Sequence, residues 1–108
     1  MVKLILIFWK DIPAQVIVQR GRTREKAVLS QRFHEAIDRA AMRAGKGSSD
    51  AYIAEWRREA SQLETNDDLK DIAANEISRL EAEYPDERLL KLIRNHGSDD
   101  SHGAITDD

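Results

Sequence analysis

The fold is decided by residues 2–20, which read VKLILIFWKDIPAQVIVQR. The stretch from Val2 to Trp9 is almost continuously apolar and rich in β-branched and aromatic residues, which is typical of a buried strand. Residues 10–13, KDIP, predict a turn because proline fixes φ. From Ala14 to Arg20 the alternation of side chains predicts a second strand with one wetter face. A connection this short permits only antiparallel pairing, so we expect an N-terminal antiparallel β-hairpin.

A long amphipathic helix of about 20 residues is expected next, because apolar residues recur there at helical spacing. Gly21 ends the second strand and Thr23 is placed to cap the helix. Gly45 and Gly47 are placed to end it. The inward residues are Leu29, Phe33, Ala36, Ile37, Ala40 and Ala41. This is the clearest periodic signal in the chain.

Three shorter helices are expected in the second half of the chain. The first is capped by Ser48, Ser49 or Asp50 and has inward Tyr52, Ile53, Trp56, Ala60 and Leu63. The next is capped by Asn66 or Asp67 and carries Leu69, Ile72, Ala73, Ile77 and Leu80. The last runs from Asp86 to Arg94, with Pro85 fitting its first position.

Together these elements predict an α+β fold in which an N-terminal antiparallel β-hairpin is followed by three to four helices packed on it. The 108 residues suit a single domain, expected over 1–96, and residues 97–108 are typical of a disordered acidic tail. A lone hairpin is barely stable in water, so helices, a further strand or a second copy of the chain must cover it. Since an open apolar edge favours aggregation, a homodimer paired through the hairpin edge is a further expectation.

The composition excludes several kinds of site. The chain has no cysteine, which rules out disulfides, zinc–thiolate sites, iron–sulfur clusters and thiol nucleophiles. The apolar run from Leu4 to Trp9 is too short for a signal peptide or a membrane span, which needs about 20 apolar residues. We therefore expect a cytoplasmic protein without a membrane partner.

Charge is distributed unevenly along the chain. Residues 1–46 carry ten Lys or Arg and four Asp or Glu, whereas residues 47–108 carry seven and sixteen. Such a split indicates either that the two halves complement each other or that a basic face meets an anionic partner.

The candidate binding residues lie in and beside the hairpin. Residues 20–26, RGRTREK, fall where the second strand is expected to pass into the long helix, and cations at a helix N-terminus suggest a bound anion. The alternative is that these arginines are solvated or pair with the acidic second half. Trp9 and Trp56 fit either core positions or docking anchors. The predicted anion- or partner-binding residues are Trp9, Lys10, Arg20, Arg22 and Arg24.

No catalytic residue, metal ligand or cofactor is predicted. His34 on the long helix has no second ligand at metal spacing, and His96 and His102, near Asp99 and Asp100, give weak support for a divalent metal in the tail. The acids of the last two helices read as a solvated face: Glu76, Glu81, Glu83, Asp86 and Glu87. The sequence contains no Walker, GxGxxG, HExxH or GxSxG motif, which favours a protein that is not an enzyme.

Three segments carry a resemblance to a known family. They are LIFWKDIPAQVIV over 6–18 followed by Gly21 and Arg22, FHEAIDRAAM over 33–42, and YIAEWRR over 52–58. They resemble a short bacterial family labelled virulence factor, whose longer relatives are called conserved virulence factor C. The resemblance implies no catalytic residues. It implies an accessory role beside folate- and corrinoid-linked methyl transfer, although the sequence lacks the Asp-x-His-x-x-Gly pattern of corrinoid binding.

Three functions stay open at this point. The leading hypothesis is a non-catalytic accessory protein that docks on a protein partner, with enzymes of methyl metabolism as first candidates. The second is a nucleic-acid-binding protein that uses the basic segment 20–46, against which Glu35 and Asp38 count because they interrupt its arginines. The third is a small enzyme that acts on an anionic metabolite held by Arg20 and Arg22.

Overall fold

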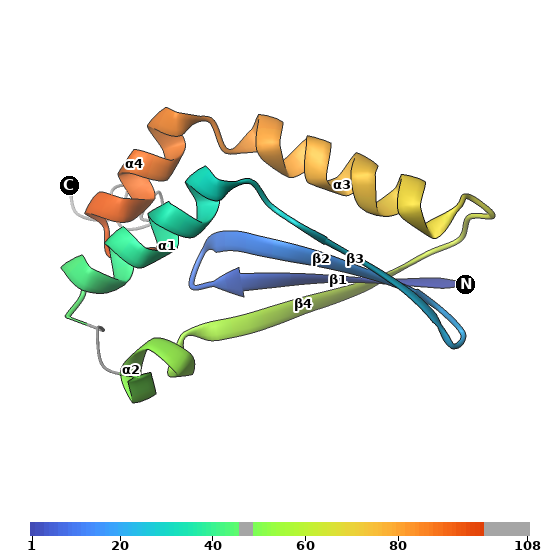
Figure 1. The fold of residues 1–108 in the computed structure, drawn as a ribbon, viewed down its shortest axis with the longest axis horizontal. Helices are drawn as coiled ribbons and strands as arrows, with labels where there is room; N and C mark the ends of the chain where they lie inside the picture. Colours follow the sequence, from blue (N-terminus) through green and yellow to red (C-terminus); the bar gives the residue numbers. More distant parts are fainter. Residues whose placement is uncertain (46–48, 99–108) are drawn as a thin grey trace, which may run out of the picture.

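A computed structural model describes residues 1–45 and 49–98, which form one four-stranded sheet and four helices. The elements are β1 (Val2–Trp9), β2 (Ile12–Arg20), β3 (Thr23–Val28), α1 (Gln31–Arg43), α2 (Ser49–Ala54), β4 (Trp56–Leu63), α3 (Leu69–Glu83) and α4 (Asp86–Arg94). The strands are antiparallel and lie in the order β3-β2-β1-β4 (Figure 1). The predicted α+β class with an N-terminal hairpin is therefore confirmed.

The hairpin of β1 and β2 forms as its sequence predicts. Leu4 lies opposite Val18, and Leu6 lies opposite Val16. Residues directly opposite in an antiparallel pair share one face of the sheet, so these side chains point the same way. The two outer edges of the hairpin are occupied within the chain, by β3 on β2 and by β4 on β1. The open edge that suggested a homodimer is thus covered by the chain itself.

The prediction that the long helix begins near Thr23 is wrong, because residues 23–28 form strand β3. Gly21, at φ 59°, makes the tight turn between β2 and β3, a conformation that glycine adopts without strain. Half-buried and exposed residues alternate in the second half of β3, which is the period of a strand. Helix α1 begins only at Gln31, after Ser30 in extended conformation.

The predicted helix carrying Trp56, Ala60 and Leu63 is also wrong. Helix α2 ends at Ala54, and residues 56–63 form β4, which pairs with β1 along its whole length. The three residues have helical spacing, but β4 is an edge strand whose residues between its two ends are all exposed. Because neither face of β4 is buried between its ends, its sequence has no alternation of apolar and polar residues that would predict a strand.

Helices α3 and α4 form where the sequence predicts them. Helix α3 is capped by Asp68, whose carboxylate accepts a hydrogen bond from the backbone N–H of Lys70, and not by Asn66 or Asp67. Helix α4 follows Pro85, which stands one position before the first helical residue.

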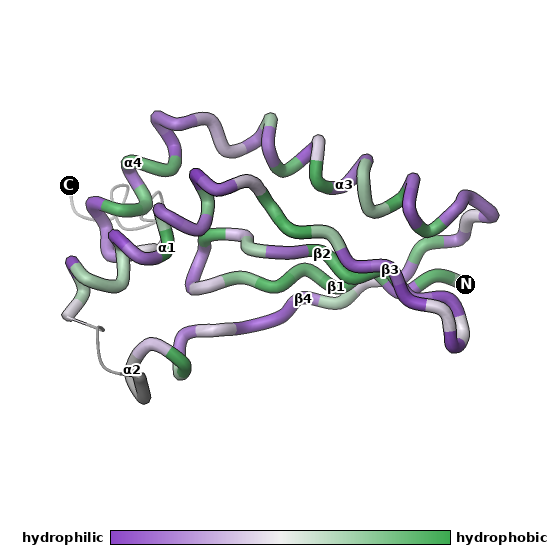
Figure 2. The backbone as a smooth tube through the Cα atoms, viewed as in Figure 1, coloured by the Kyte–Doolittle hydropathy of each residue, from purple (hydrophilic) through white to green (hydrophobic). Residues whose placement is uncertain are grey.

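Helices α1, α3 and α4 cover one face of the sheet. Figure 1 shows them on the same side of the strands, and α4 packs beside α1. Helices α1 and α3 both pack on β2, and α3 also packs on β3. The core joins Val16 and Val18 of β2 to Phe33 of α1 and Leu80 of α3. Figure 2 shows the apolar runs of β1 and β2 beneath these helices, and the hydrophilic tip between β2 and β3.

The end of α4 is fixed against the turn between β1 and β2. The N–H of Gly97 donates to the carbonyl oxygen of Leu92 at 2.6 Å, and its own carbonyl oxygen accepts from the N–H of Asp11 at 2.9 Å. A Cβ atom at Gly97 would lie 2.6 Å from Cζ3 of Trp9, and its φ is 94°, so glycine is required here. The predicted disordered tail falls on residues 97–108, of which 99–108 lie outside the described residues.

Candidate functional site

The predicted binding residues do not form a single site. Trp9 and Lys10 lie at the turn between β1 and β2, whereas Arg20, Arg22 and Arg24 lie at or beside the turn between β2 and β3. Strand β2 joins the two turns and rises about 3.3 Å per residue, which places them about 25 Å apart. The structure therefore brings the three arginines together and separates them from Trp9 and Lys10.

Trp9 is a core residue and offers no surface to a partner. Its exposed fraction is 0%, and its indole N–H donates to the carbonyl oxygen of Tyr52 at 2.9 Å. Its ring stacks on that of Tyr52 with 5.9 Å between centroids, and Trp56 packs edge-on against the same tyrosine. The Nζ atom of Lys10 lies 5.7 Å from the centre of the Trp9 ring. These tryptophans serve packing at this end of the sheet.

The junction at residues 20–26 is a β-hairpin, so the helix-dipole argument for an anion site there does not apply. Arg20 donates to the carbonyl oxygens of Thr65 at 3.1 Å and Asp67 at 2.8 Å, which holds the loop between β4 and α3. Arg22 is exposed. A hollow of about 130 Å³ beside Gly21 has neither Arg20 nor Arg22 in its lining, so the hypothesis of an anionic metabolite gains no support there.

The basic segment 20–46 does not form one surface in its described part, residues 20–45. Its first half lies in β2 and β3 and its second half in α1, which packs on the helix-covered face. Arg32 of α1 is engaged by α3 and α4 and is not available as part of an exposed arginine stripe. The basic segment is therefore divided between the hairpin of β2 and β3 and helix α1, on which Arg39 and Arg43 stay exposed.

The strands sort their charged side chains between the two faces of the sheet. On the face away from the helices, residues directly opposite one another form rows across β3, β2, β1 and β4. The rows are Arg24–Gln19–Lys3–Gln62, Lys26–Ile17–Ile5–Ala60 and Val28–Gln15–Ile7–Arg58. We call these residues the open face.

The open face is positively charged. Its charged residues are Lys3, Arg24, Lys26 and Arg58, all exposed, and no acidic residue stands in the three rows. Glu25 of β3 lies opposite Val18 and therefore points to the helix-covered side. Glu59 of β4 lies opposite Leu6 and also points to the helix-covered side. The sequence signal for this sorting is the alternation of charge sign over residues 24–26 and 58–59.

Isoleucines form the floor of the open face. Ile5 is only 1% exposed and lies in the middle row between Ile17 and Ala60. The stems of long Lys and Arg side chains can pack on such apolar residues while their charged ends stay in water. Val28 at the edge is 56% exposed. Arg57, next to Arg58 in β4, donates to Glu59 and therefore lies on the other side of the sheet, where its guanidinium carbon is 4.4 Å from the centre of the Phe8 ring.

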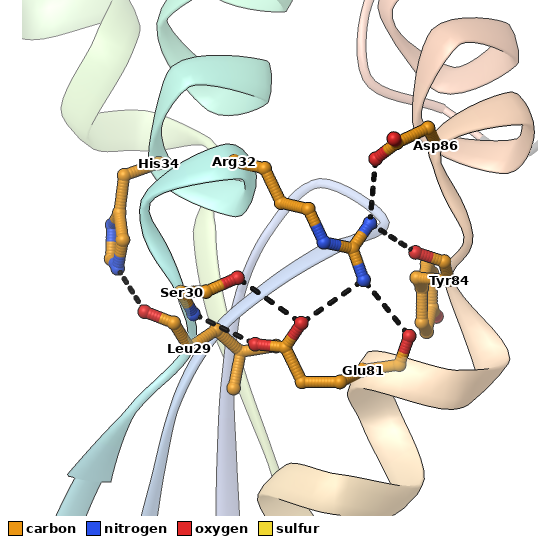
Figure 3. A network of polar contacts seen from close by, with 7 residues as sticks. All are labelled: Leu29, Ser30, Arg32, His34, Glu81, Tyr84 and Asp86. Carbon is orange, nitrogen blue, oxygen red and sulfur yellow. Dashed lines mark hydrogen bonds and ion pairs between the residues drawn. The ribbon is translucent and has the colours of Figure 1, made fainter.

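A second polar cluster joins α1, α3 and α4, as Figure 3 shows. The Glu81 carboxylate accepts hydrogen bonds from the N–H (2.9 Å) and hydroxyl (3.1 Å) of Ser30, and from Arg32 at 3.0 Å. Arg32 also donates to the carbonyl oxygens of Glu81 (2.9 Å) and Tyr84 (2.6 Å), and to the carboxylate of Asp86 (3.2 Å). We call Ser30, Arg32, Glu81, Tyr84 and Asp86 the helix joint.

The helix joint corrects the prediction that the acids of α3 and α4 are simply solvated. Burial disfavours the charged form of Glu81, but the hydrogen bonds from Ser30 and Arg32 and the charge of Arg32 outweigh it and lower the pKa of Glu81. The carboxylate is therefore ionised and engaged at neutral pH. His34 lies beside the joint, with its Nε2 atom 3.1 Å from the carbonyl oxygen of Leu29 (Figure 3). The arrangement fixes three helix ends relative to one another.

The surface outside the open face and the helix joint has a further apolar feature, a groove between two helices. This groove of about 450 Å³ between α1 and α4 has apolar Met42, Leu90 and Ile93 in its lining, with Arg39 and Arg43 beside them. Within residues 1–45 and 49–98, no group of three or more His, Asp or Glu is placed to hold a metal ion. None of the described helices is long and apolar enough to cross a bilayer. We take the open face as the candidate site because its four cations share one surface with no acid among them.

The fold and the open face define a small α+β protein with one exposed basic sheet surface. Over residues 7–93 the chain matches the family described as virulence factor, and it belongs to that family. The match confirms the predicted family and extends through α3 and α4, beyond the segments that carried the resemblance. The relation to conserved virulence factor C stays a prediction. No curated protein and no solved structure matches the chain.

Proposed function

We propose that this protein is a non-catalytic accessory protein that docks on a protein partner through the open face. The observation that carries the proposal is that the open face gathers four cations, Lys3, Arg24, Lys26 and Arg58, and no acid, whereas Glu25 and Glu59 point to the other side. Like charges gathered on one surface repel each other, and an anionic partner relieves that repulsion. Such a surface also accelerates association with an acidic partner at low ionic strength.

The helix joint supports a non-catalytic role. Its carboxylate, Glu81, is held ionised by Ser30 and Arg32, whereas a general acid or base works best with a pKa near the operating pH. Arg32 is occupied by carbonyl and carboxylate oxygens of α3 and α4. The cluster therefore serves the position of the helices, and no step of a reaction is assigned to it.

The resemblance of the sequence to this family implies an accessory role beside folate- and corrinoid-linked methyl transfer. Enzymes of that metabolism are therefore the first partners to test. An acidic surface on such an enzyme is the feature to look for, because opposite charge on the two partners sets both orientation and encounter rate. The arginines predicted at the turn keep a part in this proposal, since Arg22 is exposed beside the open face and Arg24 belongs to it.

Affinity capture from native cell extract tests the proposal. The test variant reverses three open-face cations, Arg24→Glu, Lys26→Glu and Arg58→Glu. The matched control reverses three exposed cations on the helices, Arg43→Glu, Lys70→Glu and Lys91→Glu. Both variants receive the same change in net charge, and thermal unfolding measured by circular dichroism shows that each is folded.

The proposal predicts that the wild type and the control variant capture the same protein and that the open-face variant loses it. Mass spectrometry identifies the captured protein. Equal capture by all three proteins, or loss of capture only in the helix control, would place the docking surface elsewhere. Capture of nucleic acid alone would favour the nucleic-acid hypothesis in place of this one.

A further inference from the structure

We infer that the open face receives an amphipathic α-helix of the partner, whose apolar stripe is flanked on both sides by Asp or Glu. This inference rests on the proposed function and names the kind of element that docks. It follows from how apolar and charged residues are arranged across the four strands.

The charges stand at the margins of an apolar strip. Partly exposed Ile17 of β2 and Ile7 of β1, with buried Ile5 between them, occupy the two central strands. Arg24 and Lys26 stand on the outer strand β3, and Arg58 stands on the opposite outer strand β4. Adjacent strands lie about 4.8 Å apart, so the two outer strands are about 14 Å apart.

An α-helix has the width that this arrangement requires. With side chains it is about 10–12 Å across, so a helix laid on the isoleucine strip fits between the cations of β3 and β4. Acidic residues on its two flanks would then reach Lys26 on one side and Arg58 on the other. Lys3, in the first row of β1, lies under one end of such a helix.

The opposite face of the same sheet already accepts a helix of this kind. Helix α3 packs on β2 and β3 through buried Leu69, Ile72, Ala73 and Leu80. Its acids Asp71 and Glu83 stay exposed. Helix packing on these strands is therefore a contact that the twist and spacing of the sheet permit.

Two other occupants fit the open face less well. A second copy of the chain, paired through the same face about a two-fold axis, would place the four cations of one copy against those of the other. A single-stranded nucleic acid needs aromatic rings on which its bases stack, and the three rows contain none.

Photo-cross-linking in native cells tests the inference. The full chain carries p-benzoylphenylalanine in place of Gln15, in the third row, or in place of exposed Ser78 on α3 as the control. Mass spectrometry then identifies the peptide joined to each position. Each protein is also made with Lys26→Glu and Arg58→Glu, and extracts are cross-linked at low and high salt.

The expected cross-link from position 15 falls in a helical segment of a partner protein, with acids on both sides of an apolar stripe. The charge reversals lower its yield about tenfold or more, and high salt lowers it as well. A cross-link to a strand or loop, to a second copy, to nucleic acid or to lipid overturns the inference, as does a yield no higher than that from position 78. A cross-link to a strand or loop of an acidic protein would overturn the inferred helix and leave the proposed function standing. If no protein is cross-linked in a charge-dependent way, both the inferred helix and the proposed function are refuted.

Binding in solution separates the macromolecular classes. Fluorescent oligo(dT) and vesicles containing phosphatidylglycerol are titrated with the wild type and with the Lys26→Glu, Arg58→Glu variant. We expect the affinity for oligo(dT) and for vesicles to fall no more in the Lys26→Glu, Arg58→Glu variant than in the Lys70→Glu, Lys91→Glu control, which has the same net charge. A selective loss of oligo(dT) or vesicle binding in the open-face variant would contradict the inferred helix.

Discussion

Replacement of Glu81 by alanine should destabilise the protein by about 2 kcal/mol, because hydrogen bonds to charged groups contribute about 1.5–3 kcal/mol each and water restores part of the loss. The change removes the acceptor of the Ser30 N–H at 2.9 Å and of Arg32 at 3.0 Å. The side chains of Arg32 and Glu81 are 31% and 28% exposed, so water reaches both groups after the change. Arg32 also keeps the carbonyl oxygen of Tyr84 as an acceptor.

Urea unfolding followed by circular dichroism measures this loss, and a thermal melt should fall by about 10 °C for a domain of this size. The control is Glu83→Ala, which removes an exposed partner of Arg79 and should cost less than about 1 kcal/mol. Equal effects of the two substitutions would refute the view that the helix joint holds α1, α3 and α4 together. A change in the urea slope would instead indicate a change in the unfolded or native ensemble.

The stabilisation from Glu81 should also depend on pH with a defined sign. Its pKa is lowered in the folded protein, so the unfolded chain binds more protons in acid. The contribution is therefore complete above the pKa of an unfolded glutamate, about 4.3, and is lost as the pH falls through the lower folded value. The difference in stability between the wild type and Glu81→Gln should be largest at neutral pH and shrink in acid. A difference that grows as the pH falls would contradict the assignment.

Three further substitutions test the packing, each by urea unfolding. Gly97→Ala places a Cβ atom 2.6 Å from Trp9 at φ 94°, so it should destabilise the protein by about 1–3 kcal/mol, and a neutral effect would contradict the close contact. Trp9→Phe removes the N–H bonded to Tyr52 and leaves a void, with an expected loss of about 2–4 kcal/mol; a loss below that of an average surface change would argue against a core role. Gly21→Ala meets no atom within 4 Å but has φ 59°, so strain alone should cost about 1–2 kcal/mol, and a stabilised variant would show that the turn has another conformation.

The parts of the fold that the sequence predicts are those with a strong local pattern. The apolar run of β1 identifies the hairpin, and the spacing of Phe33, Ala36 and Ile37 identifies the body of α1. The start of α1 was misplaced because Thr23 resembles a cap and Leu29 continues the helical spacing backwards. The alternation of Arg24 and Lys26 with Glu25 and Ala27 was the competing signal, and it was the correct one.

Strand β4 lacked a signal of its own. Its position is set by pairing with β1, which is distant in sequence, and its exposed residues show no apolar alternation. Trp56 packs against the core at one end of β4 and Leu63 at the other, and their separation along the chain also fits the repeat of an amphipathic helix. Tertiary pairing thus overrides local preference at this edge of the sheet.

The candidate site was predicted only in part. The sequence indicates a basic N-terminal half, and Arg24 does belong to the open face. The contributions of Lys3 and Arg58 depend on strand order, which brings β1 and β4 side by side, and no local pattern reports that order. The contacts of Arg20 with the carbonyl oxygens of Thr65 and Asp67 could not be predicted, because those residues follow a strand whose sequence predicts a helix.

The pairing of β1 with β4 also implies an order of events during folding. Strands β1, β2 and β3 are joined by short turns and pair early, whereas β4 reaches β1 only across a long loop that contains α1 and α2. Until that loop closes, the apolar β1 has one unpaired edge, which is a template for pairing with another chain. Refolding should therefore lose yield as protein concentration rises, and this loss should diminish once β4 has docked.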